Sequence, residues 1–555
     1  MRQHIADQSV DLVYLDPPFN SNRNYSVIFG RNRDPDESAA QIEAFEDTWR
    51  WSLDTDILIS ELSGTAPQRV ADAISAYYTL LGESEALAYL VNMTPRLLQL
   101  HRVLKPTGSL FLHCDPTMSH YLKVLLDAIF DVGNFRNEIV WKRTSAHSDT
   151  KQGRQGFGGI HDVILFYSKG KDLTWNAYHT PYSPEYFAGD YRHTAPDGRL
   201  YKEGDVTAAK PGGDTEYLWP VKRQEGGKWE ADLTDEYLTP EAGWQYLDVK
   251  PYNGRYWAYS KQNMREFAAQ GKLAHRSTGA PRLMLFADEM PGIGPQDIWT
   301  DINPIGAKAA ERLGYPTQKP LALMERIISV ASNEGDVVLD PFCGCGTTVD
   351  AAQRLGRRWI GIDITYLAID VITKRLQHTY GNEVFDTVLV DGIPKDLTAS
   401  RALFAQSPLD FERWAVSMVN AEPNEKQVAD KGIDGVARFP LLKGKIGKLL
   451  VSVKGGKTIN PSMVRDLGGT VEAQSAQMGV LITLSAATKG ITDAINRGGV
   501  FTHPANGQKY PRLQHITVAD LLAGKRPQVP PTFLPYIAAQ AHTVTLEQSG
   551  LFSVV

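Results

Sequence analysis

Two short apolar runs that lie far apart in the chain each end at an aspartate. Residues Val10 to Leu15 precede Asp16, and residues Val337 to Leu339 precede Asp340. Apolar runs without polar alternation are typical of strands buried on both faces, as in a parallel sheet covered by helices. In such sheets the functional groups follow the carboxyl ends of the strands. The pattern therefore predicts an α/β protein with its chemistry close to the two aspartates.

The segments around these runs alternate between helix and strand patterns. Apolar residues at helical spacing predict helices over 97–104, 121–129 and 321–332. The run Lys105-Pro106-Thr107-Gly108 should end the first of these helices. Short runs rich in β-branched and aromatic residues predict strands over 109–113, 137–141, 162–167 and 359–362. Alternation of this kind favours a doubly wound α/β sheet.

The composition is that of a globular protein from a reducing compartment. Hydrophobic residues make up 42% and charged residues 22% of the 555 residues, so the chain has ample apolar surface to bury. Three cysteines in so long a chain argue against a disulfide scaffold. No apolar run approaches the ~20 residues of a membrane helix, and the N-terminus lacks the apolar core of a signal peptide. We therefore expect a cytoplasmic protein without a membrane partner. The net charge of −6 neither indicates nor excludes nucleic acid.

The character of the chain changes between residues 171 and 305. The stretch 171–260 holds 11 of the 23 tyrosines and 5 of the 11 tryptophans, is rich in Gly and Pro, and shows no sustained helical period. We expect a β-rich insert in which most of these rings form the core. The alternative is that rings beside basic residues stack on bases, at Lys222-Arg223, Lys228-Trp229 and Arg255-Tyr256-Trp257.

The string Asp340-Pro341-Phe342-Cys343-Gly344-Cys345-Gly346-Thr347-Thr348 is the strongest local signal. It lies between a predicted buried strand and a helix that should start near Val349. Its two glycines allow a tight turn, and the helix start offers free N–H groups to a ligand. A second acid, Asp363, follows the next predicted strand, where a carboxylate can accept both ribose hydroxyls of a nucleoside cofactor. Cys343 and Cys345 have no matching second pair, so we expect them to fill the loop rather than hold a metal.

The second signal is Asp16-Pro17-Pro18-Phe19-Asn20, at the end of the first strand. Two prolines hold a rigid, extended turn whose carbonyls point outward as acceptors. One carboxylate, one fixed carbonyl and one aromatic ring suit a flat ring that bears an amino group. Asp16 and the Pro17 carbonyl would accept its hydrogens while Phe19 stacks on the ring, which leaves the nitrogen lone pair free to attack a methyl sulfonium.

Together these strings resemble the β class of amino-group DNA methyltransferases, which methylate adenine N6 or cytosine N4 with S-adenosyl-L-methionine. Asp16-Pro17-Pro18-Phe19 matches their catalytic motif, and Thr317-Gln318-Lys319-Pro320 matches an additional cofactor-binding motif. The catalytic motif precedes the cofactor loop, so the resemblance implies a Rossmann-like fold with circularly permuted motif order. The cofactor-binding residues that it implies are Thr317, Lys319, Pro320, Asp340, Pro341, Phe342, Gly344, Gly346, Thr347, Thr348 and Asp363.

The resemblance also implies what the protein acts on. Its partner would be double-stranded DNA, and the target base would be flipped out of the stack. Asp rather than Ser at the first motif position, with Phe19, leans towards adenine N6; a cytosine-N4 enzyme is the alternative. The aromatic insert falls where this class carries its target-recognition domain. Such enzymes belong to bacterial or phage restriction-modification systems.

One departure from the family concerns the sheet edge. In this family another strand and a Gly-Asp turn usually precede the catalytic strand, whereas here the run at Val10 starts close to the N-terminus. Either Met1 is not the natural start, or another segment completes that edge. The candidate is Thr387-Val388-Leu389-Val390-Asp391-Gly392.

A third constellation lies near the C-terminus and resembles the PD-(D/E)xK restriction endonucleases of the Mrr-like kind. Asp434 and Lys454 stand in the matching places, and Asp434 would be the ligand of a Mg²⁺ ion. Ser452 stands where that family has Glu or Gln, so an active nuclease and a DNA-binding remnant are both open. Lysines at 443, 445, 448, 454 and 457 would form a phosphate-facing patch or a solvated hairpin.

We expect five parts: a catalytic part (1–170), the target-recognition insert (171–305), a cofactor-binding part (306–390), an endonuclease-like domain (405–525) and a tail (526–555). The leading expectation is a DNA adenine-N6 methyltransferase. A restriction protein whose main activity is cleavage and a catalytically silent DNA-binding module are the rivals from other classes. A homodimer is compatible with the sequence.

Overall fold

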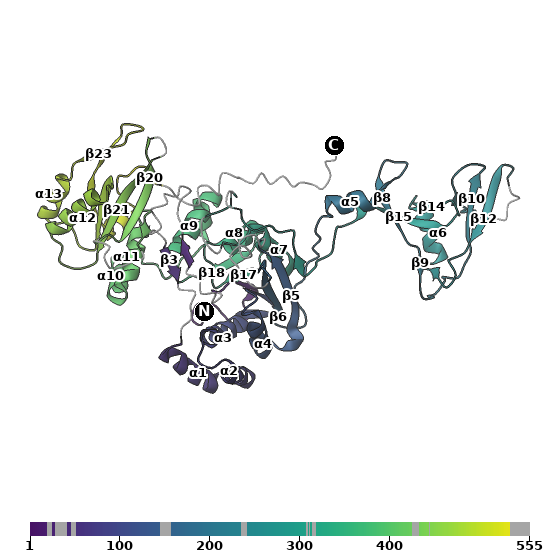
Figure 1. Cartoon of the computed structure of the whole chain (residues 1–555), viewed down its shortest axis with the longest axis horizontal. Coiled ribbons are helices and arrows are strands. Elements are labelled where there is room, and N and C mark those ends of the chain that lie inside the picture. Colours follow the sequence, from purple (N-terminus) through teal and green to yellow (C-terminus); the bar gives the residue numbers. More distant parts are fainter. Residues whose placement is uncertain are drawn as a thin grey trace. The chain divides into compact units, whose positions relative to one another are not determined.

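The computed structural model describes residues 1–18, 25–27, 42–45, 51–144, 157–234, 241–306, 309, 311–313, 318–424, 432–442 and 445–532. The chain forms two compact units (Figure 1). The first unit contains residues 1–176 and 297–555, and the second contains residues 177–296. Among the residues described, no helix is long and apolar enough to cross a membrane.

A seven-stranded sheet forms the centre of the first unit. In spatial order its strands are β16 (Ile298–Trp299), β5 (Phe135–Lys142), β6 (His161–Ser168), β4 (Leu104–Cys114), β1 (Val10–Leu15), β17 (Val337–Asp340) and β18 (Arg358–Gly361). Strand β6 is antiparallel to both of its neighbours, and the remaining pairs are parallel. The strands predicted from apolar runs are therefore confirmed as members of one α/β sheet.

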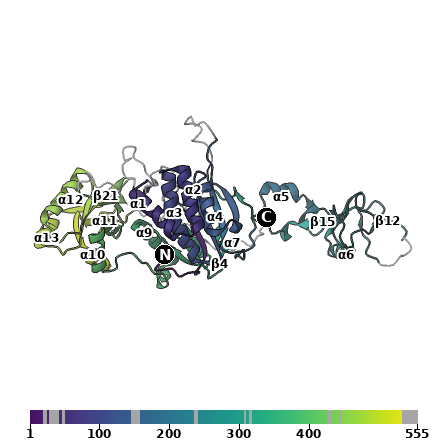
Figure 2. The same ribbon diagram turned by 90° about the horizontal axis from the view of Figure 1, so that it is seen from below.

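Helices cover both faces of this sheet, which explains why its central strands show no polar alternation. The bundle of α1 (Leu53–Thr65), α2 (Gln68–Leu81), α3 (Glu85–Val103) and α4 (Ser119–Phe130) is seen in Figure 2. It packs in one core with Val10, Val13 and Leu15 of β1. The opposite face of β1 carries Leu12 and Tyr14, which pack in a second core with α7 (Leu321–Ala331) and α8 (Thr347–Arg354).

Two local expectations differ from the structure. Helix α3 begins at Glu85 instead of residue 97, because Ser84 caps it by accepting a hydrogen bond from the Leu87 N–H at 3.3 Å. The proposed edge strand at 387–392 is wrong. None of these residues is in a strand, and Leu389 is 82% exposed. Within the described residues β18 is the last strand on that side of the sheet, and the apolar side chains of 388–390 are half-buried or exposed instead of packed in a core.

The first unit also contains a small two-stranded ribbon and the helix that follows β18. Strands β2 (Tyr25–Val27) and β3 (Ile42–Phe45) form an antiparallel ribbon. Helix α9 (Tyr366–Tyr380) follows β18, and its residues Ile372 and Leu376 share a small core with Cys343 of the loop after β17. This core connects the loop directly to α9.

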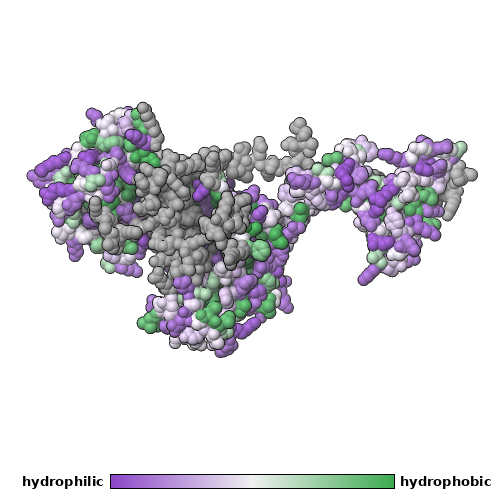
Figure 3. Space-filling model, in the orientation of Figure 1, coloured by the Kyte–Doolittle hydropathy of each residue, from purple (hydrophilic) through white to green (hydrophobic). Residues whose placement is uncertain are grey.

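The second unit is β-rich, as the composition of the insert predicts. Its elements are α5 (Pro184–Asp190), β7 (His193–Thr194), β8 (Leu200–Gly204), β9 (Thr207–Ala208), β10 (Trp219–Gln224), β11 (Glu230–Ala231), β12 (Trp244–Val249), β13 (Tyr256–Trp257), α6 (Lys261–Ala269), β14 (Leu273–His275) and β15 (Pro281–Phe286). Trp219 and Trp257 are fully buried in its main core. The face seen in Figure 3 is mostly hydrophilic with scattered apolar side chains.

The two ends of this unit are joined to each other. Thr180 and Ile293 form an isolated antiparallel bridge, with N–H to carbonyl distances of 2.9 and 2.8 Å. Gly292 has a φ of 105°, and a Cβ there would lie 2.4 Å from the Thr180 carbonyl oxygen. Only glycine therefore fits beside the bridge.

The C-terminal part of the chain has its own five-stranded sheet and its own cores. Its strands, in spatial order, are β19 (Glu422–Pro423), β20 (Gly435–Pro440), β21 (Ile446–Lys454), β22 (Met478–Thr483) and β25 (Leu513–Thr517). The accompanying elements are α10 (Leu397–Gln406), α11 (Pro408–Ser417), α12 (Pro461–Ala473), α13 (Lys489–Asn496), α14 (Val518–Leu522), β23 (Val500–Thr502) and β24 (Lys509–Pro511). Alternate residues of β21 belong to different cores, Val451 to one and Leu450 to the other, so both faces are covered.

Candidate active site

The two aspartates that end apolar runs are brought to one edge of the sheet. Strands β1 and β17 are parallel neighbours, with Leu12 opposite Val338 and Val13 opposite Leu339. Asp16 and Asp340 therefore leave the sheet at the same side, although most of the chain separates them in sequence. This is the arrangement in which ligand sites form in open α/β sheets.

Asp16 forms a close ion pair with Lys319, which precedes α7. Each of the two side chains is 12% exposed. A largely buried pair of this kind is held in a single geometry more strictly than a surface pair. The ion pair links the motif after β1 to the additional cofactor-binding motif predicted at residues 317–320. Lys319 was expected only among the cofactor-binding residues, and its ammonium group contacts the Asp16 carboxylate.

Asp340 is a buried carboxylate with an unusual pKa. Burial, together with the nearby charges of Asp16 and Asp363, raises its pKa to about 7. Its Oδ1 accepts a hydrogen bond from the Phe342 N–H at 3.0 Å, and Thr348 also hydrogen-bonds to it. The acid is thus partly protonated near neutral pH, and a cation placed beside it would favour its charged form.

The loop after β17 depends on Gly346 for its shape. This residue has a φ of 78° and lies at the N-cap of α8. A Cβ there would lie 2.6 Å from Ile372 Cγ1 of α9. Gly346 therefore allows the backbone of this loop to approach the neighbouring helix α9 closely. Gly344 also has a positive φ, of 47°, and Cys343 and Cys345 are buried, as expected of residues that fill the loop.

Asp363, which follows β18, is tied to this loop. Its Oδ2 accepts from the Gly344 N–H at 3.0 Å, and its Oδ1 accepts from the N–H and hydroxyl of Thr365 at 2.9 and 2.8 Å. Burial raises the pKa of the carboxyl, and these hydrogen bonds oppose the rise. The carboxylate is thus positioned from two sides and keeps lone pairs for further donors.

The other predicted site residues fall into two groups. Phe19 and Thr317 lie outside the described residues. Pro17, Pro320, Thr347 and Thr348 are buried, and Pro18, Pro341 and Phe342 are half-buried. The roles of Phe19 and Thr317 therefore stay predictions, whereas Phe342 and Thr348 contact the Asp340 carboxyl directly.

A buried chain of polar side chains near the end of β1 is not apparent from the sequence patterns. The Tyr14 hydroxyl lies 2.9 Å from His113 Nδ1, and His113 Nε2 lies 3.2 Å from the Asp162 carboxylate. Arg143 Nε lies 3.0 Å from the other carboxylate oxygen. Tyr14, His113 and Asp162 each fall inside a predicted strand or at its edge. The available signal was therefore a polar residue in an otherwise apolar strand.

A second buried network was also missed. Asp350 of α8 accepts from Arg375 of α9 at 2.6 Å and from the Tyr380 hydroxyl at 2.5 Å, and Arg354 lies 3.3 Å away. The side chains of Asp350 and Arg375 are 2% and 9% exposed. Burial alone would raise the pKa of Asp350, but Arg375 and Tyr380 hold it below its usual value. The network fastens the helix that carries the loop.

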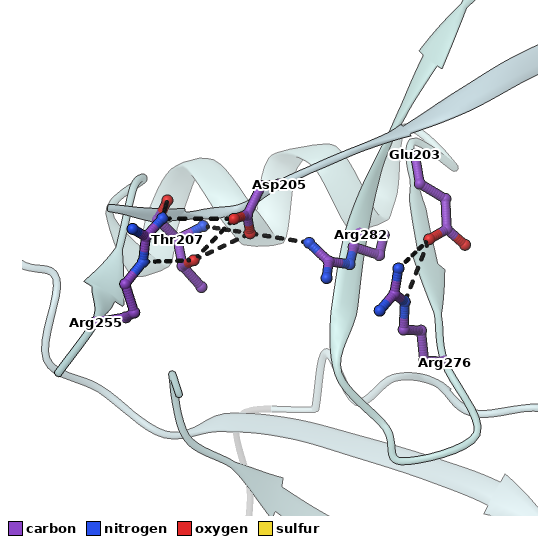
Figure 4. A network of polar contacts seen from close by, with 6 residues as sticks. All are labelled: Glu203, Asp205, Thr207, Arg255, Arg276 and Arg282. Atoms are coloured by element: carbon purple, nitrogen blue, oxygen red, sulfur yellow. Dashed lines mark hydrogen bonds and ion pairs between the residues drawn. The ribbon is translucent and has the colours of Figure 1, made fainter. Parts of the chain in front are cut away.

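The insert uses several of its basic residues internally. Asp205 accepts from Arg282 at 2.9 Å and pairs with Arg255 at 3.5 Å, and Arg276 pairs with Glu203 at 2.9 Å (Figure 4). Of the basic–aromatic groups singled out in the sequence, the one around Arg255 and Trp257 is therefore structural.

The other basic–aromatic groups have rings and cations in contact. Lys222 lies over the Trp244 ring at 5.2 Å, and Arg223 lies over the Trp229 ring at 4.3 Å. Both cations also have polar partners within the insert, since Lys222 lies 3.9 Å from Asp232 and Arg223 donates to Gln245 at 2.8 Å.

The C-terminal residues singled out in the sequence come together. Asp434 Oδ2 accepts from the Val453 N–H at 2.5 Å and lies 3.6 Å from Lys454 Nζ and 3.4 Å from the Ser452 hydroxyl. Ser452 donates to the Gly432 carbonyl at 2.8 Å. Over the described parts of the chain, no group of three or more His, Cys, Asp or Glu side chains could hold a metal ion.

Comparison with known families gives two matches. Residues 10–374 match the family described as DNA methylase, of the N6/N4 type. Residues 410–523 match the family described as NACHT-associated inactive restriction endonuclease 1. The first match spans more than half of the chain, and it includes both aspartates and Lys319.

Individual relatives agree with the first match. The type II methyltransferase M.EcaI of Enterobacter cloacae is 32% identical over 291 residues, which are 52% of this chain and 57% of the relative. The type III restriction-modification enzyme StyLTI Mod subunit of Salmonella typhimurium is 26% identical over 489 residues, which are 84% of this chain and 65% of the relative. The chain thus spans less than two thirds of the length of both relatives. A solved M1.HpyAVI–SAM complex has 15% identity, 66% coverage of this chain, 90% coverage of that chain and a TM-score of only 0.26.

Proposed function

The chain belongs to the N6/N4 DNA methylase family, and from this premise we propose that it transfers a methyl group from S-adenosyl-L-methionine to an exocyclic amino group of a base in DNA. Adenine N6 is the target that we propose, and cytosine N4 is the alternative. The observation that carries the proposal is the position of Asp16 and Asp340 at one edge of adjacent strands, β1 and β17. The catalytic motif and the cofactor loop would then face one reaction centre.

The residues at this edge suit the cofactor. The carboxylates of Asp340 and Asp363 are acceptors of the kind that ribose hydroxyls and an ammonium group require. The N–H groups at the start of α8 add donors, and Gly346 is needed for the turn that leads to them. When bound, S-adenosylmethionine supplies a methyl group on an electron-poor sulfonium.

The chain's own residues would prepare the base. We propose that Asp16 and the Pro17 carbonyl accept the hydrogens of the target amino group, while Phe19 stacks on the ring. Accepting hydrogen bonds from the amino group makes the nitrogen lone pair available for in-line attack on the methyl carbon. The carbon–nitrogen bond then forms as the carbon–sulfur bond breaks, and the extra proton of the nitrogen passes to Asp16 or to water. Lys319 would keep the Asp16 carboxylate in place before the base arrives.

The function can be tested directly. The protein is incubated with isotope-labelled S-adenosylmethionine and unmethylated DNA, and the nucleosides are analysed by mass spectrometry. Labelled N6-methyladenosine supports the proposal, and N4-methylcytidine supports the alternative. Absence of both from DNA of diverse sequence would contradict the function.

Asp363 gives a prediction for cofactor binding. Changing Asp363 to Ala removes a buried acceptor, and losing such a charge-assisted hydrogen bond typically costs about 1.5–3 kcal/mol, or roughly ten- to a hundredfold in affinity. Calorimetry should therefore show weaker S-adenosylmethionine binding. Asp72→Ala, on α2, is the matched control, because Asp72 is exposed and accepts a hydrogen bond from Gln68 of its own helix. Equal affinity in Asp363→Ala and the parent would contradict the assignment.

The C-terminal domain gives a prediction for separability. We propose that it is not needed for methyl transfer, and the match to an inactive restriction endonuclease favours a non-cleaving role. Lys454→Ala should leave the methylation rate unchanged. Asp434 is already engaged by the Val453 N–H and Lys454, so any Mg²⁺-dependent cleavage should be slow and need millimolar-range metal.

A plasmid-cleavage assay with titrated Mg²⁺ checks the second half of this prediction. The double variant Asp434→Ala, Lys454→Ala serves as its control. Rapid cleavage at trace Mg²⁺ would show that the domain is an active nuclease, and cleavage that survives in the double variant would place the nuclease site elsewhere.

A further inference from the structure

The buried polar chain beside Asp16 connects three strands at the edge that carries the candidate site. Tyr14 belongs to β1, His113 to β4 and Asp162 to β6. Strand β6 is antiparallel to β4, so its first residues lie at the same edge as the last residues of β1 and β4. All three side chains are at most 3% exposed. This hydrogen-bonded chain therefore lies at the edge of the sheet where β1 ends and Asp16 follows.

The hydrogen bonds and charges around Asp162 and Tyr14 indicate which of these groups carry a proton. Burial acts to raise the pKa of Asp162, but the hydrogen bond from His113 and the charges of Lys319 and Arg143 hold it below its usual value. An ionised carboxylate only accepts hydrogen bonds, so His113 Nε2 carries the proton. The other ring nitrogen, Nδ1, lies at hydrogen-bond distance, 2.9 Å, from the Tyr14 hydroxyl. Burial, followed by the charges of Asp16, Asp340 and Asp162, raises the pKa of Tyr14, so its hydroxyl keeps its proton.

Tyr14 connects these hydrogen-bonded side chains to the candidate active site. Tyr14 lies two residues before Asp16, and residues at this spacing along a strand point to the same face. Only Leu15 lies between Tyr14 and Asp16, so a shift of the Tyr14 backbone also moves the Asp16 backbone. An apolar residue would fill the same volume without the free-energy cost of burying an ion. A buried ion at this place therefore calls for a role that packing alone does not serve.

We propose that Tyr14, His113 and Asp162 are positioning residues that fix the end of β1, and through it the Asp16 carboxylate, against the amino group of the target base. The carboxylate at one end of the chain holds the imidazole in a single tautomer and orientation. The His113 ring orients Tyr14 through the hydroxyl group, and Tyr14 in turn fixes the position of the end of β1. Lys319 restrains Asp16 from the opposite motif, so the catalytic carboxylate is held on two sides. This inference rests on the proposed function.

The mildest test removes one oxygen atom. Tyr14→Phe breaks the bond to His113 and keeps the ring. A small displacement of a reacting group from its productive position lowers the rate of reaction by roughly ten- to a hundredfold. We expect that loss in the single-turnover rate of methyl transfer, measured on a preformed complex with saturating S-adenosylmethionine. The affinity for S-adenosylmethionine and the melting temperature should stay at the parent values.

Tyr167→Phe is the matched control. Tyr167 is buried on the same strand as Asp162, and its hydroxyl donates to Asp127 at 2.7 Å near the opposite end of that strand. Losing this hydroxyl should leave the single-turnover rate unchanged. A pair of His113 variants adds a second comparison. His113→Gln can still donate to Asp162 and accept from Tyr14, so it should keep most of the rate, whereas His113→Met should lose it.

The outcomes separate the inference from the proposed function. If the parent protein does not methylate DNA, the proposed function fails. If the parent is active and Tyr14→Phe and His113→Met have its rate, the inference fails. If Tyr14→Phe loses rate, cofactor affinity and melting temperature together, the chain is only structural and the inference fails. A lower rate in Tyr14→Phe and His113→Met with unchanged cofactor affinity, together with most of the parent rate in His113→Gln, supports the inference.

Discussion

Replacing Asp16 by alanine should abolish methyl transfer while S-adenosylmethionine still binds. The carboxylate is the one charged acceptor of the catalytic motif, and it lies against Lys319 at the edge of β1. Loss of a group that acts on the reacting nitrogen typically lowers the rate by roughly a hundred- to ten-thousandfold. Transfer of labelled methyl groups to DNA measures the loss, and calorimetry measures cofactor binding.

A second variant tests whether the loss of methyl transfer in Asp16→Ala reflects only a less stable protein. Asp16→Ala leaves the Lys319 ammonium group without the Asp16 carboxylate in a largely buried place, and this alone can destabilise the protein. The double variant Asp16→Ala, Lys319→Met removes that charge as well. It should regain stability against thermal unfolding but no methylation. Methylation at the parent rate in Asp16→Ala would refute the catalytic assignment.

The largest effect on stability is expected at the buried network between α8 and α9. Changing Arg375 to Leu leaves the carboxylate of Asp350, which is 2% exposed, without its closest cation. Breaking a buried ion pair in this way typically costs about 3–5 kcal/mol. Hydrogen exchange should show faster opening of α8, and the melting transition should move to lower temperature.

The control for this prediction is a surface pair in the same unit. Arg69 and Asp131 lie 2.9 Å apart, and their side chains are 62% and 54% exposed. Exposed pairs contribute about 0–1 kcal/mol, so Arg69→Leu should change stability little. Equal effects of the two changes would mean that Arg354 and Tyr380 satisfy Asp350 without Arg375.

The sequence predicts the sheet and the loops of the site well, because both depend on local patterns. The apolar runs before Asp16 and Asp340 carry the signal of doubly covered strands, and the Gly-rich string before α8 carries the signal of a turn into a helix. The contact between Lys319 and Asp16 could not be predicted, since it joins two motifs that meet only in the folded sheet.

The same reason explains the two missed networks and the wrong edge strand. His113 and Asp162 look like ordinary polar interruptions until β4 and β6 lie side by side. Asp350 looks like an exposed helical acid until α9 covers it. The apolar residues around Leu389 look like a strand, but a strand also needs a partner, and none of the strands described pairs with them. Patterns report burial tendency, whereas pairing depends on the whole topology.

The bridge between Thr180 and Ile293 has a consequence for how such proteins diversify. The chain enters and leaves the insert at a single closed neck, so the distance across the neck does not depend on what lies beyond it. Recombination between related genes could then replace everything between these residues in one exchange, without altering the reaction centre. An exchange that keeps Gly292 should therefore give a folded hybrid.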